Sequence, residues 1–291
     1  MAETSKIEWT DATWNPITGC NLVDDGCRIN EQWLDQPLRW RKARMIFVCV
    51  HGDLFHEQVP DEWIDQVFAV MALAPHHTFQ VLTKRPDRMR QYLSAQRSIN
   101  GVGERIRDTA LIKSDWKGPL SVGAAFTAFN GLEMQNPWWP LRNVWLGTSV
   151  SDQESANERI GPLMEAPAAI RFLSVEPMLG KIDLAELRPA FGNGTYQDRD
   201  PVPLKGYAIR ASSRGYEDSI NADRIRMPKL DWVICGGESG SNARPMHPDW
   251  ARDLRDDCHD AGVKFFFKQW GNKLDCREHN ALPESARLHA R

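Results

Sequence analysis

Polar side chains follow a series of apolar runs, at the points where those runs end. Carboxylates, ammonium groups and backbone amides gathered in this way supply the acids, bases and anion partners of an active site. The predicted catalytic residues are Glu176, Glu238 and Lys268, and the predicted cofactor-binding residues are Asp53, Lys84, Arg85, Ser149, Gly236, Gly237 and Ser239. For each residue the alternative is a solvated loop or a structural ion pair, for example between Glu176 and Lys84 or Arg85.

Two of these positions have the residue types of an anion-binding site. The glycine run 236–240 can expose backbone N–H groups toward an anion, although it lacks the spacing of a P-loop or of a dinucleotide-binding loop. Lys84 and Arg85 precede Pro86 at a predicted helix start, where the helix N-terminus also favours negative charge. A tight turn and an ordinary surface helix start are the alternatives.

The cysteines suggest a metal site. Cys20 and Cys27 flank a loop, and thiolates on such a loop are typical ligands of a cluster or a soft metal ion. Cys49 and His51 alternate at a strand end and therefore face the same side. If that side points into the fold, three thiolates and one imidazole would suit zinc or an atypical cluster. The alternative is that Cys49 is a small core residue and His51 an ordinary loop histidine.

Short runs rich in β-branched and aromatic residues predict the strands, and their near-continuous apolar character is typical of parallel sheets. The runs are Met45–Val50, Thr78–Thr83, Asn143–Ser149, Ile170–Val175, Trp232–Cys235 and Lys264–Lys268, with a further first strand at Lys6–Trp9. Periodic patterns predict helices over Asp61–Ala74, from a capping box at Ser151–Glu154 to Glu165, and over Asp249–Ala261.

Strands and helices alternate at intervals of about 30 residues, which is the pattern of βαβ units. We therefore predict an α/β fold: a parallel (β/α) partial or closed TIM-like barrel of roughly six to eight strands, with an open doubly wound sheet as second choice. The segments near 95–140 and 185–229 are interpreted as insertions, each long enough to hide another strand, and 272–291 as a polar tail. All 291 residues are assigned to a single domain.

The composition is that of an ordinary globular protein, with 42% hydrophobic and 26% charged residues. A net charge of -3 gives no global attraction to nucleic acid or to a membrane surface. The N-terminal residues are polar, and no apolar run is long enough to span a bilayer. We therefore expect a cytoplasmic protein with no membrane partner.

One local segment nevertheless suggests nucleic acid or a nucleotide as a partner. The run Arg39–Arg44 is basic and contains Trp40. Its cations would contact phosphates while Trp40 stacks on a base. The alternative is a solvated basic edge that precedes a strand and prevents aggregation.

The chain contains a series of long motifs, of which the first is Lys-Ile-Glu-Trp-Thr-Asp-Ala-Thr-Trp-Asn-Pro-Ile-Thr-Gly-Cys, which ends at Cys20. In this motif the chain resembles a phage and prophage family known by a three-cysteine motif. The resemblance continues through Gln36–Lys42, Asp53–His56, Phe79–Pro86, Trp145–Ser149, Ser174–Pro177, Gly236–Gly240 and Phe266–Gly271. It covers most of the chain outside the two insertions.

That family resembles radical S-adenosylmethionine proteins, in which three thiolates on a loop after the first strand hold a [4Fe–4S] cluster. The open iron of such a cluster binds the amine and carboxylate of S-adenosylmethionine. The resemblance implies both cofactors, with Cys20 and Cys27 as ligands, and a dedicated partner protein encoded nearby. In this chain Asn30 stands where the third cysteine is expected, and an amide is a poor ligand for iron.

Three functional hypotheses follow. The first is a phage-type protein of the radical S-adenosylmethionine kind, with a degenerate iron–sulfur site, that modifies a nucleotide, a nucleic acid or a protein. The second is a non-catalytic or zinc-binding barrel that binds a ligand. The third is a nucleic-acid-binding module. The sequence does not decide whether the protein is an enzyme.

Overall fold

The computed structural model describes residues 5, 7–19, 26–95, 109, 140–184, 207–209, 224–226 and 228–274. The chain divides into two compact units, residues 1–147 with 166–170 and residues 148–165 with 171–291. Strand β6 (Val144–Val150) contributes its first residues to one unit and its last residues to the other. The division therefore leaves the single-domain prediction open.

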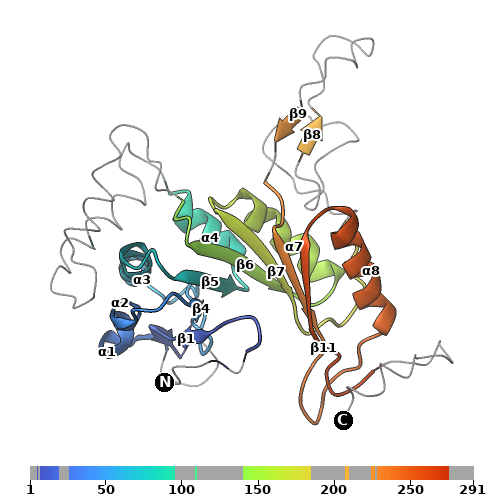
Figure 1. Ribbon diagram of the computed structural model, residues 1–291, viewed down its shortest axis with the longest axis horizontal. Helices are drawn as coiled ribbons and strands as arrows, with labels where there is room; N and C mark the ends of the chain where they lie inside the picture. Colours follow the sequence, from blue (N-terminus) through green and yellow to red (C-terminus); the bar gives the residue numbers. More distant parts are fainter. Residues whose placement is uncertain are drawn as a thin grey trace. The chain divides into compact units, whose positions relative to one another are not determined.

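The first unit is a parallel sheet with helices (Figure 1), in the strand order β1 (Ala12–Trp14), β4 (Met45–Val48), β5 (Thr78–Thr83) and then the start of β6. Trp14 of β1 pairs with Val48 of β4, which in turn pairs with Val81 of β5. A separate antiparallel pair joins β2 (Ile17–Thr18) to β3 (Arg28–Ile29). The helices of this unit are α1 (Glu31–Leu34), α2 (Gln36–Arg39), α3 (Asp61–Leu73) and α4 (Pro86–Leu93).

Helix α3 illustrates why this unit folds as it does. Its apolar stripe, which includes Ile64, Val67 and Met71, is fully buried, as the helical periodicity predicts. Asp61 and Glu62 in its first turn stabilise the helix, because their negative charges interact favourably with the positive end of the helix dipole. The helix ends before Pro75, because the residue preceding a proline avoids the helical conformation.

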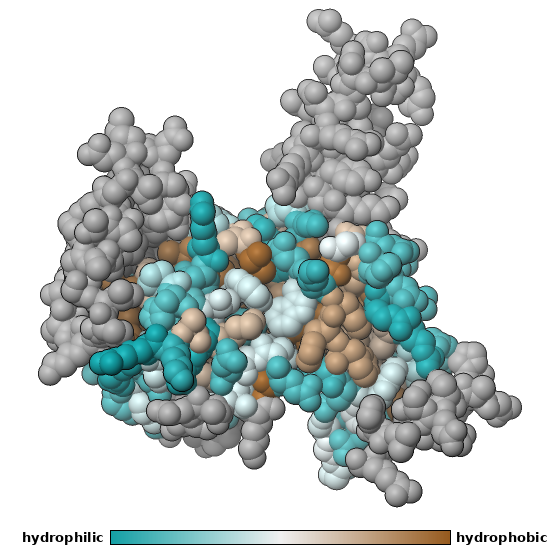
Figure 2. Space-filling view, in the orientation of Figure 1, coloured by the Kyte–Doolittle hydropathy of each residue, from teal (hydrophilic) through white to brown (hydrophobic). Residues whose placement is uncertain are grey.

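The second unit is also a parallel sheet with helices, in the order β6-β7-β10-β11. Strand β10 (Trp232–Gly236) pairs with both β7 (Ile170–Val175) and β11 (Lys264–Gln269) in parallel. Helix α7 (Gln153–Glu165) follows β6, and α8 (Pro248–Asp260) contacts β10 and β11. The three phenylalanines of β11, residues 265–267, are half-buried, and an apolar area lies over this strand in Figure 2.

The fold prediction is confirmed at the level of the α/β class with parallel strands. A sheet of seven strands is consistent with a partial barrel, whereas TIM-like closure stays a prediction. The strands expected at Thr78–Thr83 and Ile170–Val175 have these bounds in the structure. The expected strand at Lys6–Trp9 is wrong: the described residues 7–9 form a turn, closed by a hydrogen bond from Thr10 N–H to Ile7 O at 3.1 Å, and β1 begins at Ala12.

The capping box that opens α7 is displaced by one residue from the prediction. Asp152, not Ser151, caps the helix: its carboxylate accepts from Ser155 N–H at 2.8 Å, and Ser155 Oγ accepts from Asp152 N–H at 3.1 Å. Hydrogen bonds from Ser155, first from its N–H and then from its hydroxyl, lower the pKa of Asp152. A carboxylate is the stronger acceptor at a helix N-terminus because its charge also interacts with the helix dipole.

The predicted insertions lie mostly outside the described residues, as does the tail from residue 275 onward. Within the second insertion an antiparallel pair joins β8 (Tyr207–Ile209) to β9 (Arg224–Arg226), so that segment does contain further strands. None of the described helices is both long enough and apolar enough to cross a membrane.

Candidate functional site

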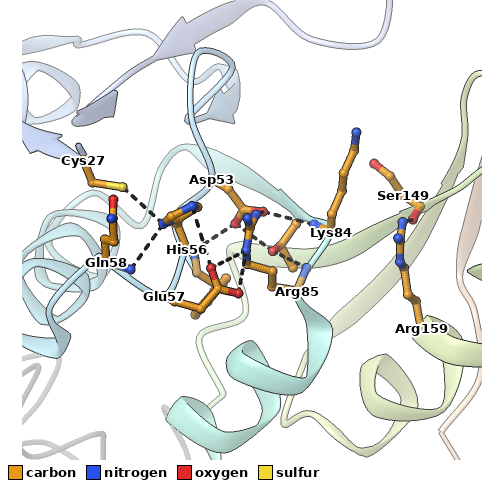
Figure 3. Close-up of polar contacts among 11 residues, drawn as sticks. Cys27, Asp53, His56, Glu57, Gln58, Lys84, Arg85, Ser149 and Arg159 are labelled. Atoms are coloured by element: carbon orange, nitrogen blue, oxygen red, sulfur yellow. Dashed lines mark hydrogen bonds and ion pairs between the residues drawn. The ribbon is translucent and has the colours of Figure 1, made fainter. Parts of the chain in front are cut away.

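Asp53 organises the polar loops at the carboxyl ends of β4 and β5 in the first unit (Figure 3). Its carboxylate accepts hydrogen bonds from Thr83 Oγ1 at 2.7 Å, Phe55 N–H at 2.9 Å and Lys84 N–H at 3.1 Å. It also pairs with Arg85 Nη1 at 3.0 Å. Asp53, Lys84 and Arg85 are therefore brought together as the sequence predicts, but Asp53 is fully used in holding its neighbours.

Arg85 is shared between two carboxylates. Beside Asp53, its Nε donates to both oxygens of Glu57, at 2.8 and 2.9 Å. Burial acts to lower the pKa of Arg85, but these two carboxylates outweigh it and raise that pKa above its ordinary value. An anionic ligand would have to compete with both carboxylates for this guanidinium. Lys84 is the better anion partner, since its ammonium is exposed and makes no ion pair with any described residue.

The described cysteine and histidine candidates do not gather as one site. Cys49 is 3% exposed and takes a left-handed backbone conformation, with a φ of 58°, at the end of β4. His51 has an exposed side chain, and its N–H donates to Asn15 Oδ1 at 3.1 Å. Cys27 instead lies beside His56, with Sγ and Nδ1 3.5 Å apart. Among the described residues no group of three or more His, Cys, Asp or Glu is arranged to hold a metal ion, and Cys20 lies outside them.

Asn30 has a structural role at the position where a third thiolate is expected. Its side-chain N–H groups donate to Asn15 O at 2.9 Å and to Thr18 Oγ1 at 3.2 Å. Its backbone N–H donates to Pro16 O at 2.7 Å. Asn30, which follows β3, is thus tied to the segment that runs from Asn15 through β2. The described residues do not fit a three-thiolate cluster.

In the second unit, the ends of β7, β10 and β11 meet. The Lys268 ammonium of β11 contacts the Glu176 carboxylate that follows β7, and their side chains are only 26% and 21% exposed. Gly236, at the end of β10, lies between them: a Cβ there would be 3.5 Å from Lys268 Cβ and 3.6 Å from the Glu176 carboxyl carbon. The ion pair considered from sequence joined Glu176 to Lys84 or Arg85. In the structure Glu176 pairs with Lys268 instead.

Gly237 is a glycine for a structural reason. A Cβ at this position would lie 2.0 Å from the carbonyl oxygen of Trp270, which is backbone and cannot turn away. The close approach is fixed by a hydrogen bond from Gly237 N–H to Gln269 O at 2.9 Å. The loops after β10 and β11 therefore touch backbone to backbone, directly beyond the register shift between Cys235 and Gly236.

Glu238 and Ser239 belong to the same loop but are already paired. Arg244 donates from Nε and Nη2 to the two oxygens of Glu238, both at 2.8 Å, and this pairing lowers the pKa of Glu238 to about 2. Both oxygens of Glu238 are thus occupied by Arg244, and the low pKa does not suit the role of proton donor. Ser239 Oγ accepts from Gln269 Nε2 at 2.5 Å.

Two further predicted residues have other surroundings than expected. Ser149 is 8% exposed, and its carbonyl accepts from Arg159 Nη1 at 2.9 Å (Figure 3). Trp40 is 8% exposed, with the Arg44 guanidinium 4.7 Å from its ring centroid. The stacking of Trp40 on a base stays a prediction, and it would require the Arg44 guanidinium to leave the face of the ring.

Sequence reasoning missed two partners of the predicted residues. The sequence marks His56 only as the last residue of the Asp53–His56 motif, although a histidine three residues after the organising carboxylate is a usable signal. Arg244 gives no such signal, because its pairing with Glu238 depends on the turn between them. Both residues become recognisable only when the loops are folded.

Comparison with known proteins gives one informative match. No curated protein and no solved structure matches this chain significantly. A family model matches residues 28–286, from β3 to beyond β11, and thus includes both groups of strand ends described above. The chain therefore belongs to the family described as "Protein of unknown function (DUF5131)".

Proposed function

We propose that this protein binds S-adenosylmethionine and that the strand ends of the second unit recognise the amino-carboxylate end of that molecule. The observation that carries the proposal is the half-buried pair of Glu176 and Lys268 beside Gly236. A carboxylate and an ammonium side by side are the complement of a zwitterion. The ligand's amine would replace Lys268 against Glu176, and its carboxylate would replace Glu176 against Lys268.

The pair of Glu176 and Lys268 matters because Asn30 stands where the third cluster cysteine is expected. In radical S-adenosylmethionine proteins the open iron of the cluster binds the amine and carboxylate of the cofactor. Asn30 is held by Asn15 and Thr18, and the described residues do not provide three thiolates together, so cluster chemistry is no part of the proposal. Protein side chains must then supply the same recognition.

Gly236 supports access to the pair. It places no side chain between Glu176 and Lys268, whereas any larger residue would fill the space against both. Backbone without a side chain permits close approach of a ligand. The substrate on which such a complex would act, whether a nucleotide, a nucleic acid or a protein, follows from the family resemblance alone.

Isothermal titration of the full-length protein with S-adenosylmethionine tests the proposal. We expect saturable binding that K268M weakens about 10- to 100-fold, the effect of losing one charge-assisted hydrogen bond. Lys264 lies on the same strand and is exposed, so K264M is the matched control and should bind like the wild type.

Methylthioadenosine, which lacks the amino-carboxylate end, provides a chemical control. It should bind more weakly than S-adenosylmethionine and equally well to the wild type and K268M. Absence of saturable S-adenosylmethionine binding to the wild type would refute the proposal. Equal losses in K264M and K268M would also refute it, since a general charge effect would then explain the result.

A further inference from the structure

We infer that the edge of the first unit where β4, β5 and β6 begin binds the phosphate backbone of a nucleic acid. The basic run Arg39–Arg44 lies at this edge, directly before β4, and it contains four cations and no acid. Because the whole chain carries a net charge of -3, the run is a local excess of positive charge. Clustered lysine and arginine side chains are the electrostatic footprint of nucleic-acid binding. The inference does not rest on the proposed function, whose residues belong to the second unit.

The two central cations of the run are available to a ligand. Arg41 and Lys42 are exposed, and neither forms an ion pair with any described residue. The side chain of Arg39 is 48% exposed and pairs with Asp35 at 2.7 Å. Since exposed ion pairs are weak, a phosphate group can replace Asp35 in this contact. The exposed Asp11 also lies at this edge, where its carboxylate accepts from the first backbone N–H of β4 at 2.7 Å.

The backbone of the run is held on both sides of these two cations. Trp40 is 8% exposed, and its carbonyl accepts from His76 Nε2 at 2.8 Å. The carbonyl of Arg44 accepts from the N–H of Thr78, the first residue of β5, at 2.9 Å. Because the backbone is already fixed on either side, the two exposed cations lose little backbone freedom when they bind a ligand.

A further cation reaches the same edge from a distant part of the chain. The N–H of Phe79 in β5 donates to Asn143 O at 2.8 Å, which places the start of β6 beside β5. Arg142 precedes Asn143, is exposed and makes no ion pair with a described residue. Neighbouring strands lie about 4.8 Å apart, so β4 and β6 begin about 10 Å from one another, with β5 between them. Arg142 therefore extends the basic surface across β5.

The surroundings of Trp40 favour phosphates over bases as the contacted groups. The Arg44 guanidinium lies 4.7 Å from the centroid of its ring, so a base would stack there only after this cation moved. Contacts to phosphates need no such change, and they carry no sequence information. The burial of Trp40 also leaves the run without an exposed aromatic ring to insert into a lipid surface.

Charge density favours a nucleic acid over an acidic protein as the partner. Duplex DNA carries one negative charge per about 1.7 Å of its axis. An extended acidic peptide carries at most one per residue, which is one per about 3.3 Å. The consecutive cations Arg41 and Lys42 suit the denser array, and guanidinium groups such as that of Arg41 bind phosphate oxygens in pairs.

Fluorescence anisotropy of the full-length protein with fluorescein-labelled duplex DNA, at several salt concentrations, tests the inference. We expect binding that does not depend on base sequence and that falls steeply with salt. R41Q/K42Q should lower the magnitude of the slope of log K against log salt by about 2, and R142Q by about 1, because each phosphate contact contributes about 1. K264Q/K273Q is the matched control: it removes the same charge from two exposed lysines of the second unit and should bind like the wild type.

Three results would overturn the inference. The first is absent or salt-independent binding of DNA to the wild type. The second is an equal loss in R41Q/K42Q and K264Q/K273Q, since net charge alone would then explain the effect. The third is polyglutamate displacing the labelled DNA better than unlabelled DNA does at equal charge, which would assign this edge to an acidic protein. Circular dichroism verifies that each variant is folded; should R41Q/K42Q lose its native spectrum, R142Q decides.

Discussion

The ammonium of Lys268 contacts the carboxylate of Glu176, although 92 residues separate them in the chain. Glu176 follows β7 and Lys268 is the penultimate residue of β11, and β10 pairs with both strands. Parallel strands place their carboxyl ends at one edge of a sheet, so distant residues meet there. Each unit repeats this relationship: in the first unit Asp53 and Arg85 follow β4 and β5 and form an ion pair.

The coupling between Glu176 and Lys268 is measurable as a double-mutant cycle. E176Q and K268M should each lower the free energy of unfolding by about 1–2 kcal/mol, because each leaves one half-buried charge without its partner. The double variant should lose less than the sum of the two, by about 1 kcal/mol. Urea denaturation at neutral pH gives all four values. Strictly additive losses would show that the contact contributes nothing to folding.

Gly237 and Gly236 are neighbours with opposite tolerance for a side chain. G237A should destabilise the protein by about 2 kcal/mol or more, because its Cβ would meet the carbonyl oxygen of Trp270. G236A should fold with nearly wild-type stability, since its Cβ makes only ordinary contacts. Thermal or urea denaturation compares the two. Equal stability of both variants would mean that the loops after β10 and β11 separate at little cost.

Helix α7 offers a test of which residue caps it. D152A should cost about 1 kcal/mol of unfolding free energy, the usual loss of an N-cap side chain. S151A should cost under about 0.5 kcal/mol, because the capping bonds involve Asp152 and Ser155. A larger loss of unfolding free energy in S151A than in D152A would show that Ser151 caps the helix, as the sequence predicts.

Protonation of the buried His77 ring should destabilise the folded protein in acid. Its ring is buried, with Nε2 donating to Pro37 O at 3.0 Å, and burial together with the neighbouring His76 lowers its pKa from 6.5 to about 4. The folded state therefore binds this proton less readily than the unfolded state does. Stability should be complete above pH 6.5 and should fall by up to a few kcal/mol, on the order of 3, as the pH approaches 4.

Urea denaturation between pH 4 and 7 checks this expectation. H77Q should flatten the fall in stability, since the glutamine keeps a donor for Pro37 but does not titrate. H259Q should leave the fall unchanged, because His259 is exposed. An identical pH dependence in H77Q and the wild type would assign the effect to other groups.

Much of the secondary structure was predictable because it depends on local pattern. The apolar runs at residues 78–83 and 170–175 and the apolar stripe of α3 each identified their element. The prediction failed where neighbouring candidates compete, as at Ser151 and Asp152, since both residues are able to cap a helix. It failed again at the first strand, where 7–9 form a turn and the strand begins at Ala12.

The sequence by itself determined the central strands from β4 onward, the helices α3, α7 and α8, the parallel α/β class and the polar character of the strand ends, because periodicity and turn residues act over a few positions. Only the tertiary structure decided which side chains meet. It paired Lys268 with Glu176, Arg244 with Glu238 and Cys27 with His56. Charge and side-chain type make many such pairs equally plausible, and the choice among them depends on strand order and on the paths of the loops, which no local pattern encodes.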